Sequence, residues 1–450
     1  MSKLRPISVF LILLSSGISI LSGFLLDRGS PGGTGNYRAV YYGARCLIHH
    51  ADPYNPDDFL RVYRIESGEF PSNPAKNHLF LRAVSVCVNL PTTLLLVAPL
   101  AMLPWGLSHL IWLGLIACSL TIAAFLTFDI ARRYSYGVSL ALICILLANC
   151  EVLFAGGNAA GIAVGLCVIA VWCFLRERMI WAGVLCLAVS LALKPHDSGL
   201  VWLYLLVAGG TMRKRSLQSL LIVLLLAIPA VIWVSQVAPH WNQELRANLS
   251  ATSAHGDISD PGPTSISRRG SADVIIDLQT VVSVFKDDPR LYNPFVYATC
   301  GLLLAVVLAA TMRMHGTSET MWYGFAAVAA LSMLATYHRP YDAKLLLLTV
   351  PACAALWAEG GAMGRIGVLL TASAVVLTAD IPLAILSLLS GDLNTVPMSL
   401  GKRFWTIGLT RPTALVLFAT AVFFAWTCLR RSQNQLNSHH QKDAVLTITN

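Results

Sequence analysis

Charged residues are scarce in this sequence. Asp, Glu, Lys and Arg make up 12% of its 450 residues, whereas soluble domains carry about 25%. The hydrophobic share is 56%, the mean hydropathy is +0.65, and apolar runs recur from Ile7 to Trp426. So few charges cannot cover a water-exposed surface, which excludes a soluble globular enzyme and a disordered protein. The composition predicts an all-α polytopic membrane protein.

The sequence also lacks the patterns that indicate disulfides or a metal site. Its 11 cysteines are scattered through apolar segments, no CxxC spacing occurs, and only Cys46 lies in a long polar loop. The predicted outer loops contain no DxD motif. We therefore expect no disulfide scaffold, no metal and no other cofactor. The net charge of +9 is a topology signal in a membrane protein, so we expect no nucleic-acid partner.

Apolar runs of about 20 residues mark the candidate membrane crossings. They predict about 12 crossings, near 7–26, 107–128, 137–155, 161–175, 180–194, 198–212, 217–237, 293–312, 320–337, 343–358, 366–388 and 412–429. No small-residue cleavage site follows the first run, so we interpret it as a retained span.

Basic clusters between the runs assign the two sides, because cytoplasmic loops are rich in Lys and Arg. When these clusters are placed in the cytoplasm, the crossings after residue 132 run alternately outward and inward, as they must. This arrangement requires the region 83–128 to cross the membrane an odd number of times. We therefore predict that 91–103, which holds Pro91 and Pro99 and is closed by Pro104, is re-entrant or half-crossing.

This topology makes residues 1–430 a single transmembrane domain with both termini in the cytoplasm. Its first long outer loop, 27–82, contains a predicted amphipathic helix at 36–50 that would lie in the membrane interface. The second outer loop, 238–292, combines a flexible stretch with helical spacing at 272–285. We expect the polar tail, 431–450, to be disordered and the active face to lie outside.

Several short motifs follow one another between residues 30 and 360. They are YYGARCL (Tyr41–Leu47), DPYNP (Asp52–Pro56), the run from Asn89 to Trp105, GGN (Gly156–Asn158), ALKP (Ala192–Pro195) and YHRPYDAKLLL (Tyr337–Leu347). In this order they resemble glycosyltransferase family 87, which belongs to the C-type membrane glycosyltransferase superfamily. The resemblance implies a C-type fold and the transfer of a hexose, often mannose, from a polyprenyl-phosphate donor to a lipid or glycan acceptor. A donor of this type also suggests a bacterial inner (plasma) membrane.

The sequence departs from that family at one position. The family usually has an acid at the start of the amphipathic helix, expected to act as the catalytic base, whereas this chain has Asn36. An amide cannot take a proton from an acceptor hydroxyl, although Asn is a good helix N-cap. Another acid would then serve as the base, and the candidates are Asp27, Asp52, Glu151, Asp342 and Asp380.

These acids differ in their sequence settings. Asp52 precedes a proline, which is more typical of a turn. Glu151 and Asp380 lie inside apolar runs, where ionisable residues are costly and indicate function.

Cations at the outer ends of the spans are candidates to hold the donor phosphate. They are Lys194, His196, His338 and Arg339, and basic side chains of this kind bind phosphate oxygens. The alternative is that such side chains only reach the lipid headgroups. The candidate substrate-binding residues are Tyr41, Tyr42, Arg45 and Asn158, of which Asn158 could equally cap the next helix.

Three functions stay open on the sequence alone. A glycosyltransferase is favoured, chiefly by the resemblance. A transporter or flippase would also explain broken helices and the intramembrane residues Glu151, Lys194 and Asp380. A catalytically degenerate relative that only binds a lipid-linked sugar would explain Asn36.

Overall fold

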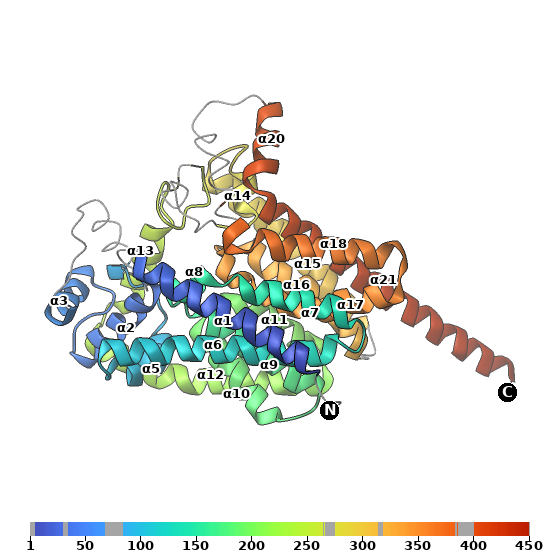
Figure 1. Ribbon diagram of the computed structural model, residues 1–450, viewed down its shortest axis with the longest axis horizontal. Coiled ribbons are helices and arrows are strands. Elements are labelled where there is room, and N and C mark those ends of the chain that lie inside the picture. Colours follow the sequence, from blue (N-terminus) through green and yellow to red (C-terminus); the bar gives the residue numbers. More distant parts are fainter. Residues whose placement is uncertain are drawn as a thin grey trace.

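The computed structural model describes residues 5–29, 35–67, 84–263, 265, 275–313, 318–382, 385 and 400–449. Every regular element in these residues is a helix (Figure 1). Seven segments among them are long and apolar enough to cross a membrane. They lie in α1 (Pro6–Gly29), α6 (Trp105–Ala131), α7 with α8 (Tyr136–Ala148 and Glu151–Gly156), α12 (Gly210–Val237), α15 (Pro289–Arg313), η2 with α17 (Pro340–Thr349 and Val350–Glu359) and α21 (Pro412–Thr449). The all-helical polytopic class is therefore confirmed, while the count of twelve crossings stays a prediction.

Shorter apolar helices complete the bundle. They are α5 (Pro91–Ala101), α9 (Ala160–Leu175), α10 (Ile180–Leu193), α16 (Ser318–Ala335) and α18 (Gly361–Leu377). The break that Pro104 predicted is present, because α5 ends at Ala101 and α6 begins at Trp105. At about 1.5 Å per residue, the 11 residues of α5 reach about half of the roughly 30 Å hydrocarbon core. This length suits the predicted half-crossing.

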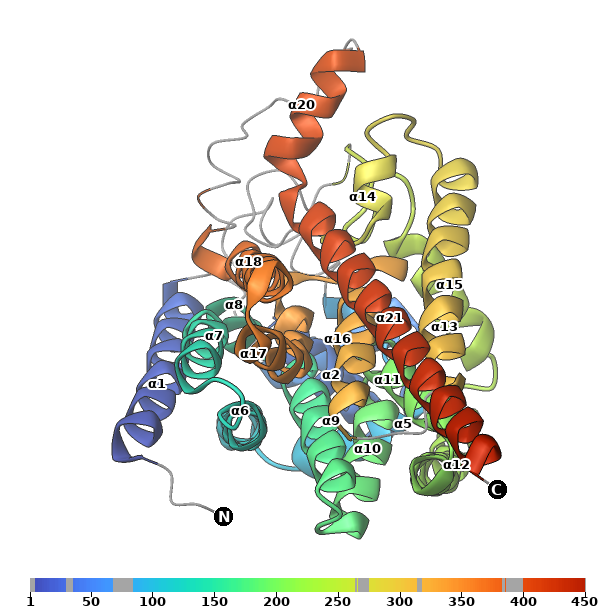
Figure 2. The ribbon, with the colours of Figure 1, turned by 90° about the vertical axis from the view of Figure 1, so that its right-hand side faces the viewer.

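The centre of the bundle consists of α9, α16 and η2 (Figure 2). All residues of η2 are buried, whereas α1 and α12 expose many leucines and isoleucines. Apolar side chains exposed on outer helices suit contact with lipid. Small residues bring α6 and α9 close together, since a Cβ built on Gly165 would lie 2.7 Å from the backbone of Ser119.

Four further helices lie outside this apolar bundle. They are α2 (Gly35–Ile48), α3 (Pro56–Ser67), α13 (Trp241–Thr252) and α20 (Leu400–Thr410). In Figure 1, α2, α3 and α13 lie at the left end, away from both chain termini. Parts of the two predicted outer loops, 30–34, 68–83, 264 and 266–274, lie outside the described residues.

The predicted amphipathic helix is present as α2, but it is not a surface helix. Its positions from Ala39 to Ala44 are all buried, because α5 packs along one side and α3 along another. Apolar periodicity shows which face avoids water but cannot tell lipid from protein. The helix is therefore covered by other parts of the protein, and its position in the membrane interface stays a prediction.

Two other expectations also differ from the structure. The helix expected over 272–285 is reduced to α14 (Gln279–Val282), flanked by turns and preceded by residues 272–274, which lie outside the described part. The tail from residue 431, expected to be disordered, continues α21 to Thr449. Extending an existing helix is much easier than nucleating one, so the apolar start of α21 can carry polar residues into the same helix.

Candidate active site

The junction of α10 and α11 (Pro195–Ala208) positions Lys194. Proline disfavours the helical conformation of the residue before it, and Lys194 has φ −153° and ψ 79°, so α10 ends there. The carbonyls of Ala192 and Leu193 accept hydrogen bonds from Thr92 (2.7 Å to Ala192) and Thr93 (3.2 and 3.0 Å) at the start of α5. The threonine hydroxyls thus donate to the backbone carbonyls that the helix break leaves free. The charged side chains nearby are not needed for this and make other contacts.

The segment that joins α16 to η2 is held in an extended conformation. Pro340 is the first residue of η2, and the side chain of Asp342 accepts the backbone N–H of Arg339 at 2.8 Å. A second segment lies alongside, since the N–H of Ile276 donates to His338 O at 3.0 Å. These bonds fix His338 and Asp342 at the centre of the bundle.

A tight corner joins α8 to α9. Gly157 has φ +59°, a conformation that glycine adopts at no steric cost, and its carbonyl accepts a hydrogen bond from Trp112 Nε1 at 2.7 Å. Asn158 Oδ1 accepts the N–H of Ala160 at 2.9 Å, so Asn158 does cap α9. Asn36 lies against this corner, because a Cβ built on Gly156 would be 2.7 Å from Asn36 Nδ2.

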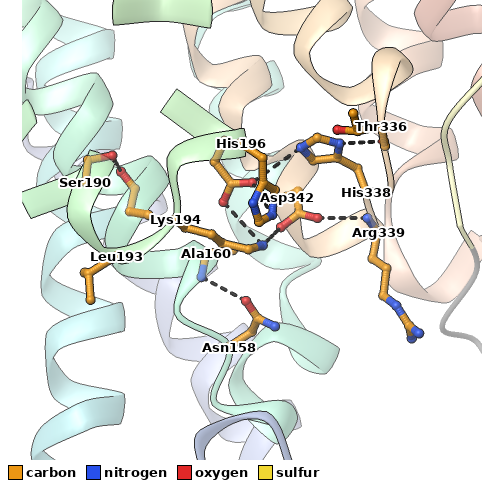
Figure 3. Close-up of polar contacts among 12 residues, drawn as sticks. Asn158, Ala160, Ser190, Leu193, Lys194, His196, Thr336, His338, Arg339 and Asp342 are labelled. Carbon is orange, nitrogen blue, oxygen red and sulfur yellow. Dashed lines mark hydrogen bonds and ion pairs between the residues drawn. The ribbon is translucent and has the colours of Figure 1, made fainter. Parts of the chain in front are cut away.

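These junctions bring five charged or imidazole side chains together (Figure 3). Lys194 Nζ forms an ion pair with Asp342 Oδ1 and lies 3.4 Å from Asp197 Oδ2. Asp197 Oδ1 lies 3.5 Å from His338 Nε2 and 3.6 Å from His196 Nε2. We call Lys194, His196, Asp197, His338 and Asp342 the Lys194 cluster.

Access to the Lys194 cluster is one-sided. The side chains of Asp197 and His338 are each 1% exposed, whereas that of His196 is 42% exposed. In Figure 3, Asn158 is drawn below Lys194 and bonds Ala160. A small anionic or polar ligand would thus meet His196 first.

Partners are missing for several buried atoms of the Lys194 cluster. Both carboxylate oxygens of Asp197 and His338 Nε2 lack a hydrogen-bond partner among the described residues. Burial disfavours a charge on His338, but Asp197 and Asp342 outweigh this effect and raise the pKa of His338. Buried polar atoms are usually satisfied, so unsatisfied ones mark a site that something else completes.

The predicted phosphate ligands are only partly brought together. Lys194, His196 and His338 belong to the Lys194 cluster. The guanidinium of Arg339 points away from them (Figure 3), bonds to Tyr337 and donates to Ile258 O at 3.1 Å. Arg339 therefore contributes its backbone, not its charge, to the cluster.

The candidate bases lie in different settings. Both oxygens of Asp342 are engaged, by Lys194 and by the backbone of Arg339. Asp52 Oδ1 accepts the N–H groups of Tyr54 (2.8 Å) and Asn55 (3.3 Å), which is the turn expected before proline. Asp342 thus has both oxygens engaged, and Asp52 has Oδ1 engaged in a turn.

Two further candidate bases lie on α1 and α8. Asp27, at the end of α1, is half-buried and interacts electrostatically with His109 and Arg38. Glu151 begins α8 and keeps Oε2 buried without a hydrogen-bond partner among the described residues. Gly23 of α1 packs directly on α8, since a Cβ built there would lie 2.9 Å from Glu151 O.

Asp380 and Lys344 serve the backbone where α7 breaks from α8. Asp380 Oδ2 accepts the N–H of Val152 at 2.8 Å, and Lys344 Nζ donates to the carbonyl of Asn149. Backbone groups freed by a broken helix inside a membrane need such partners. Asp380 therefore has a structural contact that accounts for its burial.

The three predicted substrate contacts on α2 lie in packed surroundings. Arg45 Nε donates to Glu66 at 2.7 and 2.8 Å, and Arg45 Nη1 donates to Ala101 O at 3.1 Å. Tyr41 is buried and donates to Leu103 O at 2.8 Å, and Tyr42 packs edge-on against Tyr63. These side chains tie α2 to α3 and α5, and the structure does not bring them to the Lys194 cluster.

The sequence analysis missed Asp197, Lys344 and the pair Thr92 and Thr93. Asp197 lies in the first turn of α11, where an acid is ordinarily explained by the helix dipole. A usable signal was the succession of Lys194, Pro195, His196 and Asp197, which puts a cation, an imidazole and a carboxylate at one helix break.

Comparison with known proteins places most of this site inside one family match. The family model of Glycosyltransferase family 87 matches residues 89–337, more than half of the chain. The match includes the α8–α9 corner and Lys194, ends one residue before His338, and leaves out α2 with Asn36. No curated protein and no solved structure matches the chain.

Proposed function

This chain belongs to glycosyltransferase family 87, and on that premise we propose that it moves a hexose from a polyprenyl-phosphate donor to a lipid or glycan acceptor. The hexose that we propose is mannose-like. We place the reaction at the outer face of a bacterial inner membrane, with both chain termini in the cytoplasm. Family membership itself makes the protein a membrane glycosyltransferase.

The observation that carries this proposal is the Lys194 cluster beside the α8–α9 corner. Lys194 and the imidazoles of His196 and His338 lie together at a helix break, and His196 is open to a ligand. A cation placed where charge develops on a leaving phosphate lowers the barrier to its departure. Asn158 at the α8–α9 corner uses Oδ1 to bond Ala160, so its amide hydrogens are available to a sugar hydroxyl.

The reaction follows from these positions. An acceptor hydroxyl oxygen attacks the anomeric carbon, the bond from that carbon to the phosphate oxygen breaks, and polyprenyl phosphate leaves with the bonding electrons. The hydroxyl proton passes to a carboxylate. Asn36 cannot accept it, Asp342 has both oxygens engaged, and Asp52 forms a turn. We therefore assign this step to Asp27, which interacts with Arg38 of α2, or to Glu151, which begins α8, the helix whose end lies against Asn36.

A turnover assay tests the proposal. Purified protein is incubated with a panel of polyprenyl-phosphate hexoses and a lipid extract from the source membrane, and mass spectrometry follows free polyprenyl phosphate and the glycosylated product. We expect turnover that falls about 100-fold or more in either Asp27→Asn or Glu151→Gln, because general base catalysis contributes about 10²–10⁴-fold. Full activity in both variants would refute the assignment of the base.

The variant Asn36→Asp separates an active enzyme from a silenced one. Asn36 is exposed at the α8–α9 corner, so the added carboxylate is tolerated and can reach an acceptor. Turnover only in Asn36→Asp would show a binding protein that has lost its base. Absence of turnover in both proteins, with donor and acceptor supplied, would contradict sugar transfer and favour a transporter.

A further inference from the structure

We propose that His196, Asp197 and His338 form a three-ligand site for a divalent transition-metal ion of the Zn²⁺ type. Among the described residues their ligand atoms all lie within 4.8 Å of one another. Imidazole and carboxylate are ligands that Zn²⁺ accepts, and three protein ligands with one open position are typical of reactive zinc sites. The proposal concerns metal binding alone and does not depend on sugar transfer.

The distances within the trio suit a metal better than direct hydrogen bonds. Asp197 Oδ1 lies 3.5 Å from His338 Nε2 and 3.6 Å from His196 Nε2. Hydrogen bonds from nitrogen to oxygen are usually about 2.7–3.2 Å long. Two ligands bound tetrahedrally at about 2.0–2.1 Å lie about 3.3 Å apart, which is close to both of these distances.

The backbone fixes the tautomer of His338. Its Nδ1 lies 2.9 Å from Thr336 O, and only a protonated Nδ1 can donate to a carbonyl. Nε2 is then the ring nitrogen left to bind a metal, and it faces Asp197 Oδ1. A ring N–H bonded to a backbone carbonyl is the usual outer contact of a metal-bound histidine.

The charge balance of the cluster also suits a cation. The carboxylates of Asp197 and Asp342 outnumber Lys194 by one negative charge, which a metal ion offsets. Lys194 approaches Oδ2 of Asp197, so Oδ1 stays directed at the two imidazoles.

The exposed side of His196 gives the ion a way in. The His196 side chain is 42% exposed, whereas Asp197 and His338 are 1% exposed. The fourth coordination position would therefore point to the same side as His196. An anionic oxygen reaching Lys194 could occupy that position.

The test uses the full-length, untagged protein in detergent. Metal is removed with a chelator, Zn²⁺ is added, and bound metal is measured by calorimetry and by elemental analysis after dialysis. Co²⁺ gives a second readout through its tetrahedral visible absorption. We expect one Zn²⁺ per chain and at least about 10-fold weaker binding in Asp197→Asn, His338→Gln and His196→Gln, because even outer contacts of metal sites are worth about 10–100-fold.

We expect the variant His196→Gln to fold, because this side chain is exposed and its replacement leaves no buried charge without a partner. Its result therefore holds even if the other two variants misfold. The matched control is His255→Gln, which changes the histidine of another group, His255, Asp260 and Asp287. Loss of binding in His255→Gln, equal binding in all variants, or a wild-type protein without Zn²⁺ would each overturn the proposal. None of these outcomes would contradict sugar transfer, because Lys194 supplies a cation without a metal.

Discussion

Two helix breaks in this protein each contain a buried lysine and two carboxyl groups, but they use them differently. At the α7–α8 break, Lys344 donates to the carbonyl of Asn149 and Asp380 accepts the N–H of Val152. At the α10–α11 break, Thr92 and Thr93 satisfy the free carbonyls. At the first break Lys344 and Asp380 bond the backbone, whereas at the second break hydroxyls do so and Lys194 contacts carboxylates instead.

The difference distinguishes a structural charge from a functional one. Intramembrane charge is a general indicator of function, and by that rule Lys344 and Lys194 are equal candidates. Their partners separate them, because Lys344 donates to a backbone carbonyl, whereas Lys194 lies between the carboxylates of Asp197 and Asp342. The partners of an intramembrane charge are therefore a better guide to its role than its burial alone.

The largest expected effect on stability comes from Lys344→Met. The replacement removes the cation beside Glu151 and Asp380 and leaves the Asn149 carbonyl without its donor. Removing one partner of a buried charge group costs about 3–5 kcal/mol, measured as the free energy of unfolding in detergent. Lys214→Met is the matched control, because Lys214 is exposed and should change stability by less than about 0.5 kcal/mol. If the two variants are equally stable, Lys344 does not stabilise the α7–α8 break and the two helix breaks do not differ in the way described.

A smaller loss is expected from Thr92→Val and Thr93→Val. Valine keeps the shape of threonine but leaves the carbonyls of Ala192 and Leu193 without donors, at a cost of about 1–3 kcal/mol per buried group. Unfolding of the single and double variants measures this cost. Thr299→Val is the control, since the Thr299 hydroxyl bonds only the preceding turn of its own helix. If the double variant keeps wild-type stability, the hydroxyls do not support the second break.

The smallest expected effect is the pH dependence of α13. Burial, the contact with Asp52 and the charge of Asp58 raise the pKa of Glu244 to about 7. Since the ordinary value is 4.5, the folded protein holds an extra proton between these values, and the docking of α13 weakens as pH rises through this range. Amide exchange of 241–252, corrected for intrinsic rates, should therefore be faster at about pH 8 than at about pH 5. Glu244→Gln should abolish the difference, and an unchanged difference would assign it to another group.

Much of the framework follows from the sequence. Composition predicts the membrane class, and prolines predict where helices end, as at Pro104 and Pro195. Prolines act through the neighbouring backbone, so such local effects can be predicted without knowing the fold.

The pairing of side chains could not be predicted in the same way. Lys194 and Asp342 are 148 positions apart, and only helix packing decides that they meet. The same holds for Arg45. Its motif made it a candidate to bind substrate, but in the structure it bonds Glu66 and the carbonyl of Ala101 and so has a structural role. The packed position of α2 likewise depends on α3 and α5. The periodicity of the α2 sequence carries no information about these two helices.

The central claim is that the Lys194 cluster, and not the packed α2 region, acts on the donor. The most direct measurement compares donor turnover in His196→Gln and His49→Gln. These histidines match well, because their side chains are 42% and 48% exposed and each lies beside a carboxylate. We predict that kcat/KM falls about 100-fold in His196→Gln, as for the loss of one group that stabilises developing charge, and changes less than about twofold in His49→Gln. Equal activity of the two variants would contradict the account.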